Sequence, residues 1–298
     1  MASLSFLTDF EPHYLECIQV APGVRRIVAR NPSKFTAWGT GTYVVGQGEV
    51  AVIDPGPALE PHVDAVLGAL EATGETVTHL LITHTHSDHS PAARLMQERT
   101  GAVTYGFGPH PRGADTESEE RGDHEFVPDV AVTHGQIVAG PGFEFECLHT
   151  PGHISNHVCY SERARRALFS GDHVMGWSTS VIPPPDGRVG DYLRSLQLLM
   201  DRDELAYYPT HGPPIPDPRP YVAQLIEHRL ERERQILDLL PSAPRTIPEL
   251  VDVMYVGVRP ELHEPAGRSV HAHLIKLVEE GRVTGPDERD RYAIARAG

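Results

Sequence analysis

Short apolar runs alternate with polar turns along the first part of the chain, and this pattern predicts a series of buried strands. The segment from Leu59 to Ala72 has the spacing of an amphipathic helix instead, and another strand is expected to end at Ile82. A second helix is predicted from about Pro91 to Arg99. The other predicted strands of this part are residues 14–20, 24–29, 42–46 and 50–53.

The middle of the chain repeats this organisation. A polar stretch from Gly106 to Asp129, rich in Gly, Pro and acidic residues, predicts a loop. The predicted strands are residues 102–105, 131–138, 143–149, 157–160 and 166–170, and the predicted helices are residues 190–201 and 220–240. This order predicts two sheets packed face to face with helices outside, an αββα sandwich whose strand ends gather along one edge.

The sequence changes character after residue 240. Pro241 and Pro244 end the preceding helix and predict a short, stiff linker. Thr246 and Glu249 have the spacing of a capping box, which predicts a new helix. A further helix and a hairpin are expected at residues 269–281 and at residues 282–284 with 292–294. We therefore expect two domains, residues 1–240 and residues 241–298.

The formal net charge of −15 belongs almost entirely to residues 1–240, because residues 241–298 are nearly neutral. A strongly negative body repels polyanions, which argues against a nucleic-acid substrate. Arg163, Arg165 and Arg166 form one basic cluster, for which an exposed turn between strands is the favoured interpretation. No apolar stretch reaches the roughly 20 residues that a membrane helix needs, and we expect a cytoplasmic protein that does not bind membranes.

Four side chains that can bind metal follow the apolar run ending at Ile82: His84, His86, Asp88 and His89. Because side chains alternate along an extended chain, His84 and His86 point to one side and can hold one cation. The turn after them directs Asp88 and His89 toward a second cation. For this motif taken alone, a chance cluster is the alternative, since the chain contains 18 His residues.

Three further segments have the same construction, in which a strand is followed by a tight turn and then by a metal-capable residue. They end in His153 of Thr-Pro-Gly-His, Asp172 of Ser-Gly-Asp and His211 of Thr-His-Gly-Pro. Loops at strand ends are where a rigid scaffold presents reactive groups. The repetition favours a single metal centre with nitrogen and oxygen ligands only. His110, His124 and His134 are interpreted as bystanders.

Together these motifs resemble the metallo-β-lactamase superfamily of metal-dependent hydrolases, over roughly residues 14 to 240. The resemblance implies a first zinc bound by His84, His86 and His153, a second bound by Asp88, His89 and His211, and Asp172 bridging both. Asp54, in an Asp-Pro-Gly segment, would orient the histidine loop without binding metal, and a simple turn role is its alternative. Manganese or iron are alternatives to zinc.

No cysteine occupies a ligand position, which makes antibiotic hydrolysis a poor hypothesis. Cys17, Cys147 and Cys159 are interpreted as small buried hydrophobes. Three stretches are similar to the β-lactamase-like protein 2 group, a neighbour of hydroxyacylglutathione hydrolase: residues 171–176 running on to 180–181, residues 191–196, and Thr-His-Gly-Pro-Pro-Ile followed by a helix with His228 and Arg229. Members of that group include single-strand endoribonucleases and acyl-carrier-type thioesterases. The tail resembles the winged-helix-like domain of that group. Because the tail has no net positive charge, we expect it to pack beside the active site, position substrate or form a dimer contact rather than read DNA.

The predicted reaction is hydrolysis by a hydroxide shared between two zinc ions, and a small acyl ester or thioester is the predicted substrate. Asp88 and Asp172 would hold that hydroxide, with Asp88 as proton shuttle, and His173 is a candidate acid for the leaving group. Two alternatives remain open. One is cleavage of single-stranded RNA, and the other is a non-hydrolytic role as an iron-binding redox protein or a regulatory binding module.

Overall fold

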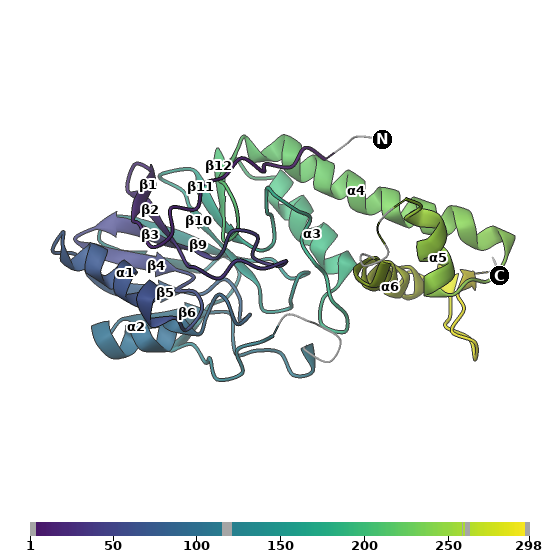
Figure 1. Ribbon diagram of the computed structural model, residues 1–298, viewed down its shortest axis with the longest axis horizontal. Helices are drawn as coiled ribbons and strands as arrows, with labels where there is room; N and C mark the ends of the chain where they lie inside the picture. Colours follow the sequence, from purple (N-terminus) through teal and green to yellow (C-terminus); the bar gives the residue numbers. More distant parts are fainter. Residues whose placement is uncertain (1–3, 115–120, 258, 260–262, 296–298) are drawn as a thin grey trace.

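The computed structural model describes residues 4–114, 121–257, 259 and 263–295 of the chain. Two sheets face each other and helices cover their outer sides, so the predicted αββα sandwich is confirmed (Figure 1). A smaller helical unit, with a short hairpin, lies at the far end of the long helix α4 (Figure 1). Among the described residues, no helix combines the length and the apolar composition needed to cross a bilayer.

The first sheet has the order β1-β2-β3-β4-β5-β6-β7. Its strands are β1 (Ile18–Ala21), β2 (Val24–Val28), β3 (Gly41–Gln47), β4 (Glu49–Ile53), β5 (Thr76–Leu81), β6 (Val103–Gly106) and β7 (Val130–Ala131). Strands β1 to β4 are antiparallel, whereas β4 to β7 run parallel. Parallel neighbours need crossover connections, and α1 (Glu60–Glu71) and α2 (Ala92–Thr100) provide those from β4 to β5 and from β5 to β6. Both helices bury their apolar side chains on the outer face of this sheet.

The second sheet has the order β13-β12-β11-β10-β9-β8. Its strands are β8 (Ile137–Gly140), β9 (Phe143–His149), β10 (Val158–Glu162), β11 (Ala167–Gly171), β12 (Ala206–Pro209) and β13 (Ile215–Pro216). The parallel pair β11 and β12 is joined through α3 (Val189–Met200). Helices α3 and α4 (Pro218–Leu239) cover the outer face, with Tyr192, Leu196 and Leu225 buried against the strands.

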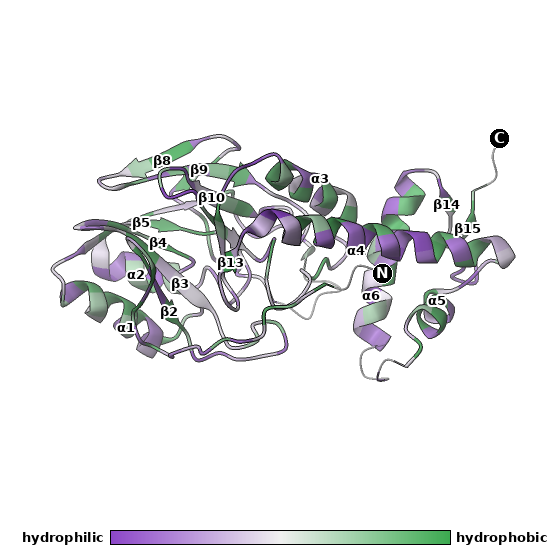
Figure 2. Ribbon diagram, turned by 90° about the horizontal axis from the view of Figure 1, so that it is seen from above, coloured by the Kyte–Doolittle hydropathy of each residue, from purple (hydrophilic) through white to green (hydrophobic). Residues whose placement is uncertain are grey.

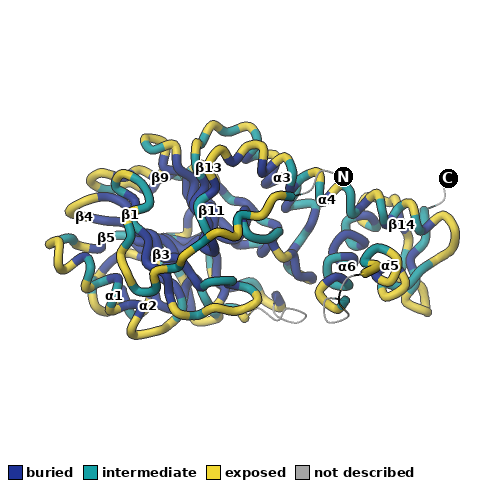
Figure 3. Tube along the Cα trace, turned by 45° about the horizontal axis from the view of Figure 1, so that its top comes forward, coloured by how far each residue is buried: buried dark blue, intermediate teal, exposed yellow. Residues whose placement is uncertain are grey.

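Aromatic side chains fill the space between the two sheets. Tyr43, Phe145, Tyr160 and Phe169 are almost fully buried there and meet mainly edge to face, and Figure 3 shows this interior in dark blue. The Tyr160 hydroxyl on β10 donates to the Ile82 carbonyl at 2.8 Å, and the Tyr43 hydroxyl on β3 donates to the Pro209 carbonyl at 2.7 Å. These two bonds join the sheets just below the loops that follow β5 and β12.

Two strand predictions were wrong. The predicted strand over residues 131–138 is divided between β7 of one sheet and β8 of the other, because the chain turns between them at Gly135, where φ is +78°. Strand β1 begins at Ile18, later than predicted, because His13 and Leu15 have positive φ values. The polar loop over residues 106–129 is confirmed where it is described, but its residues 115–120 lie outside the described part.

The cysteine prediction was correct for two of the three residues. Cys147 and Cys159 are buried within strands β9 and β10. Cys17 is exposed, because it precedes the edge strand β1 and has no second layer over it.

The C-terminal unit contains η2 (Leu240–Ser242), α5 (Ile247–Met254), α6 (His263–Glu279), β14 (Val283–Thr284) and β15 (Ala293–Ile294). The capping box is confirmed, since Thr246 and Glu249 bond each other's backbone amides. The hairpin is also confirmed, whereas α6 begins six residues earlier than predicted. Helices α5 and α6 pack on α4, and α6 also contacts α3. Figure 2 shows hydrophobic and hydrophilic residues alternating along α4, which contributes to both units.

We expect the Phe145→Ala substitution to lower the free energy of unfolding by about 3–5 kcal/mol, because the Phe145 ring is fully buried between the sheets. Urea denaturation followed by circular dichroism measures this. Ile137→Ala on the adjacent strand β8 is the control, since that side chain is 48% exposed and its truncation should cost about 0.5 kcal/mol. Equal losses in both variants would contradict this placement of the core.

Candidate metal centre

All seven predicted ligands lie together at one edge of the sandwich. His84, His86, Asp88 and His89 occupy the loop after β5. His153, Asp172 and His211 follow β9, β11 and β12, so both sheets contribute. Three overlapping groups have ligand atoms within 4.8 Å of one another: His84, His86 and His153; His84, His89 and Asp172; and Asp88, His89 and His211.

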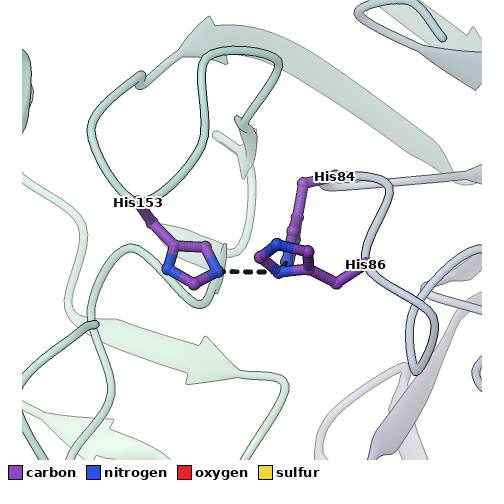
Figure 4. A group of neighbouring side chains, drawn as sticks. All are labelled: His84, His86 and His153. Atoms are coloured by element: carbon purple, nitrogen blue, oxygen red, sulfur yellow. Dashed lines mark hydrogen bonds between the residues drawn. The ribbon is translucent and has the colours of Figure 1, made fainter. Parts of the chain in front are cut away.

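The three histidines of the first group converge on a small volume (Figure 4). The Nδ1 atom of His86 lies 3.0 Å from Nε2 of His84 and 3.0 Å from Nε2 of His153. All three residues are buried. Three imidazole nitrogens held this close, with little water around them, provide one face of a cation site.

The third group, Asp88, His89 and His211, has both nitrogen and oxygen donors. The Oδ2 atom of Asp88 lies 3.1 Å from Nε2 of His211 and 3.4 Å from Nε2 of His89. Asp172 lies between the two groups, with Oδ2 at 4.0 Å from Nε2 of His153 and Oδ1 at 3.5 Å from Nε2 of His211. This is the position that the sequence predicted for a bridging carboxylate.

Three of the candidate histidine ligands have their outer nitrogen held by a specific partner. His153 Nδ1 lies 2.6 Å from the Val181 carbonyl, and His211 Nδ1 lies 3.1 Å from the Gly39 carbonyl. Each Nδ1 must donate to its carbonyl, so each Nε2 presents a lone pair to the centre. His84 Nδ1 likewise contacts the Thr83 hydroxyl at 3.1 Å, and that hydroxyl donates to Asp54.

Asp54 lies behind this loop and accepts four hydrogen bonds. Its donors are the amide and hydroxyl of Thr83, both at 2.8 Å, the Thr210 hydroxyl at 2.7 Å and His89 Nδ1 at 2.9 Å. Asp54 is fully buried and belongs to none of the three ligand groups. The carboxylate therefore fixes the orientation of His89 without facing the centre.

The donor set fits a pair of divalent cations. Nε2 of His84 and Nε2 of His153 both lie 3.0 Å from Nδ1 of His86, so a cation held among these nitrogens could be bound by all three imidazoles. His89 Nε2 and Asp172 Oδ1 are buried without a hydrogen-bond partner in the described part of the chain. Buried polar atoms are normally paired, and a cation would satisfy both.

Two family models match the chain. Residues 37–211 match the model described as the metallo-beta-lactamase superfamily, and residues 246–291 match the beta-lactamase associated winged helix domain. The chain belongs to the metallo-beta-lactamase superfamily. The seven clustered residues include every ligand position on which the resemblance in the sequence was based.

Curated members of the superfamily match the chain over almost its whole length. It is 30% identical to the atrochrysone carboxyl ACP thioesterase AacuM of Aspergillus aculeatus, covering 91% of this chain and 86% of that protein. It is 31% identical to a beta-lactamase-like protein 2 homolog of Caenorhabditis elegans, covering 94% and 91%. Because the chain belongs to this superfamily and matches these relatives over almost its whole length, the protein is a metal-dependent hydrolase.

A solved structure supports the same fold, including the C-terminal unit. The crystal structure of a beta-lactamase domain protein from Burkholderia ambifaria superposes with a TM-score of 0.80 at 20% identity, covering 97% of this chain and 96% of that one. The likeness in fold therefore covers both the sandwich and the C-terminal unit of this chain.

The pKa values of two candidate ligands, His84 and His211, are shifted in opposite directions. Burial, reinforced by the neighbouring imidazoles of His89 and His86, holds the pKa of His84 well below its usual value, so its imidazole is neutral. Burial also opposes protonation of His211, but Asp172 and Asp88 outweigh it and raise its pKa to about 10. In the absence of metal, a proton on His211 therefore supplies the positive charge that these carboxylates require.

The sequence did not identify His157 as part of the site. Its Nε2 accepts a hydrogen bond from the Asp172 amide at 3.3 Å, its Nδ1 contacts the Thr150 hydroxyl at 2.9 Å, and its ring stacks on His84. His157 is fully buried and supports two candidate ligands. Its position four residues after His153 was the available signal, but the residue was assigned only to a strand.

The remaining histidines lie outside the ligand groups. The His173 ring is fully buried against Tyr192, and burial lowers its pKa to about 3, so it is neutral there. Its predicted role as an acid stays a prediction. His110 bonds the Thr85 hydroxyl at 2.9 Å and its ring packs 6.2 Å from that of His86. It therefore borders the site, whereas His134 is exposed.

We expect Asp54→Asn to weaken binding of the second metal by roughly 10–100-fold, because an amide cannot accept all four hydrogen bonds that orient Thr83 and His89. Titration of the metal-free protein with zinc and a competing chelator measures the affinity. Asp129→Asn is the matched control, since Asp129 accepts bonds from Thr104 and Gln97 far from the centre. Unchanged zinc affinity in Asp54→Asn would contradict the assigned role.

Proposed function

We propose that this protein is a dinuclear zinc hydrolase whose substrate is a small acyl thioester or ester. The observation that carries the proposal is the set of seven nitrogen and oxygen donors in overlapping groups, with Asp172 between them. In this proposal His84, His86 and His153 hold one ion and Asp88, His89 and His211 hold the other. The thioesterase named among the relatives favours a thioester.

These residues would hold a pair of divalent ions, which would supply an activated water and a polarised acyl carbonyl, the requirements of ester and thioester hydrolysis. The protein's own groups then move protons and exclude solvent. Asp88 is the most exposed of the candidate ligands, with a side chain 23% exposed against 5% for Asp172. Asp88 is therefore best placed to take a proton from the attacking water and pass it to the leaving group.

Charge argues against RNA as the substrate. The chain carries a net charge of −15, and the basic cluster Arg163, Arg165 and Arg166 lies in the turn between β10 and β11. Each of these arginines pairs with a carboxylate, from Glu146, Glu162 and Asp203 respectively. The cluster is thus neutralised by the protein itself, leaving little positive charge for phosphates.

The substrate class is tested by supplying the zinc-loaded protein with matched thioesters, oxygen esters, a phosphodiester and labelled single-stranded RNA. We expect thioesters and esters to be cleaved and the phosphodiester and RNA to remain intact. Cleavage of RNA without thioesterase activity would reject the proposal. Elemental analysis of the purified protein distinguishes zinc from manganese and iron.

The ligand assignment is tested by His86→Ala. Because His86 Nδ1 lies between two other candidate ligands, we expect kcat/KM for the thioester to fall at least about a thousandfold, comparable to the loss of an essential catalytic interaction. His134→Ala, an exposed histidine outside the ligand groups, should leave kcat/KM unchanged. Full activity in a folded His86→Ala protein would overturn the assignment.

A further inference from the structure

A cavity of about 360 Å³ lies between the catalytic sandwich and the C-terminal unit. One wall is the segment of residues 178–183, which precedes α3, and the opposite wall is α6. Apolar side chains such as Phe35, Ile182 and Ala272 line much of it. Figure 1 shows α6 beside the end of α3, where the two units meet. The lining is suited to an apolar group of a small molecule.

Three cationic residues also line this cavity: Lys34, Arg229 and Arg268. Arg229 on α4 is the unusual one, because it is only 5% exposed. Its guanidinium donates to the Ser180 carbonyl and packs against the Tyr192 ring at 5.3 Å, while its Nε is buried without a hydrogen-bond partner. Within the described part of the chain, Arg229 has no ion pair with a carboxylate.

A buried arginine without an anion is costly, because one carbonyl and one ring contact offset only part of the hydration that the cation loses. Burial lowers the pKa of Arg229 from its ordinary value, which is the direction expected for a cation without an anionic neighbour. The protein has an excess of acidic residues, yet none of those that the structure describes pairs with this guanidinium. An anion from outside the chain would satisfy the buried Nε and neutralise the charge.

The cavity shares a wall with the metal centre. Val181 lines it, and the Val181 carbonyl accepts the hydrogen bond from Nδ1 of His153 at 2.6 Å. The adjacent Ser180 carbonyl accepts the bond from Arg229. The segment of Ser180 and Val181 thus lies between His153 of the metal centre and Arg229 of the cavity.

We propose that this cavity is a specificity site for an anionic group, a carboxylate or a phosphate, carried by the thioester substrate at a distance from the scissile bond and bound by Arg229. The inference rests on the proposed function. The anion has two possible sources, either the far end of the acyl chain or the phosphate of a phosphopantetheine thiol, and both have the same recognition chemistry. Lys34 and Arg268 also line the cavity, and Arg268 pairs with Glu264 at 3.1 Å.

The test uses the full-length, zinc-loaded protein and three kinds of thioester. The first is a series of ω-carboxyacyl thioesters of N-acetylcysteamine, from succinyl to sebacyl. The second contains the same chains with an isopropyl group in place of the carboxylate, and the third joins these neutral chains to phosphopantetheine. Thiol release gives kcat and KM for the wild type, Arg229→Met and Arg229→Lys. Arg232→Gln, one turn away on α4 and outside the cavity, is the matched control.

We expect one anionic series to be preferred over its neutral counterpart by roughly tenfold to a hundredfold in kcat/KM, the range for a hydrogen bond to a charged group. Arg229→Met should abolish this preference by raising KM for the anionic substrate, and Arg229→Lys should restore part of it. Kinetics with the neutral substrate should change little. A purely structural arginine would change both substrates equally, and that result, or no preference in the wild type, would overturn the proposal.

Two further measurements keep the outcome decisive. If Arg229→Met does not fold, Arg229→Gln replaces it, and an unchanged preference for the anionic substrate would overturn the proposal. If the wild type hydrolyses no thioester, the proposed function fails, but calorimetry with the free diacids, their isopropyl-ended counterparts and phosphopantetheine still tests the site. Tighter binding of an anion-bearing probe that is lost in the Arg229 variant supports it, whereas equal affinities reject it.

Discussion

The metal centre depends on the four hydrogen bonds that the Asp54 carboxylate accepts. Asp54 follows β4, and its four hydrogen-bond donors come from Thr83 and His89 beside β5 and from Thr210 beside β12. One buried charge thus joins the loops of both sheets. Asp54 has a φ of +48°, a conformation that Asp tolerates better than most residues. The hydrogen bonds to Asp54 therefore help to fix the positions of these ligand-bearing loops relative to one another.

The same arrangement explains how much the sequence could predict. The motif from His84 to His89 is local, so alternation along the chain was enough to place its donors. His153, Asp172 and His211 were predictable because each ends a strand, and strand ends of a sandwich gather at one edge. The division of residues 131–138 between two sheets was not predictable, because the turn at Gly135 lies within an otherwise strand-like pattern.

Roles that depend on contacts distant in the sequence were missed for a physical reason. His157 supports the site through Asp172 and His84, and neither contact follows from its own neighbours along the chain. The burial of Arg229 was also missed, because an arginine on a long polar helix ordinarily faces solvent. Its burial results from the meeting of α4 with Tyr192 of α3 and with the Ser180 segment. The cavity beside Arg229 has the segment of residues 178–183 on one side and helix α6 of the C-terminal unit on the other.

X-ray absorption spectroscopy of the zinc-loaded protein tests the central claim most directly. The account predicts a first shell of nitrogen and oxygen only, at about 2.0–2.2 Å, because the ligands are imidazoles and carboxylates. It also predicts a metal–metal distance of roughly 3.5–4 Å, as expected for a carboxylate-bridged pair. A sulfur shell at about 2.3 Å, or zinc bound without a second metal nearby, would contradict it.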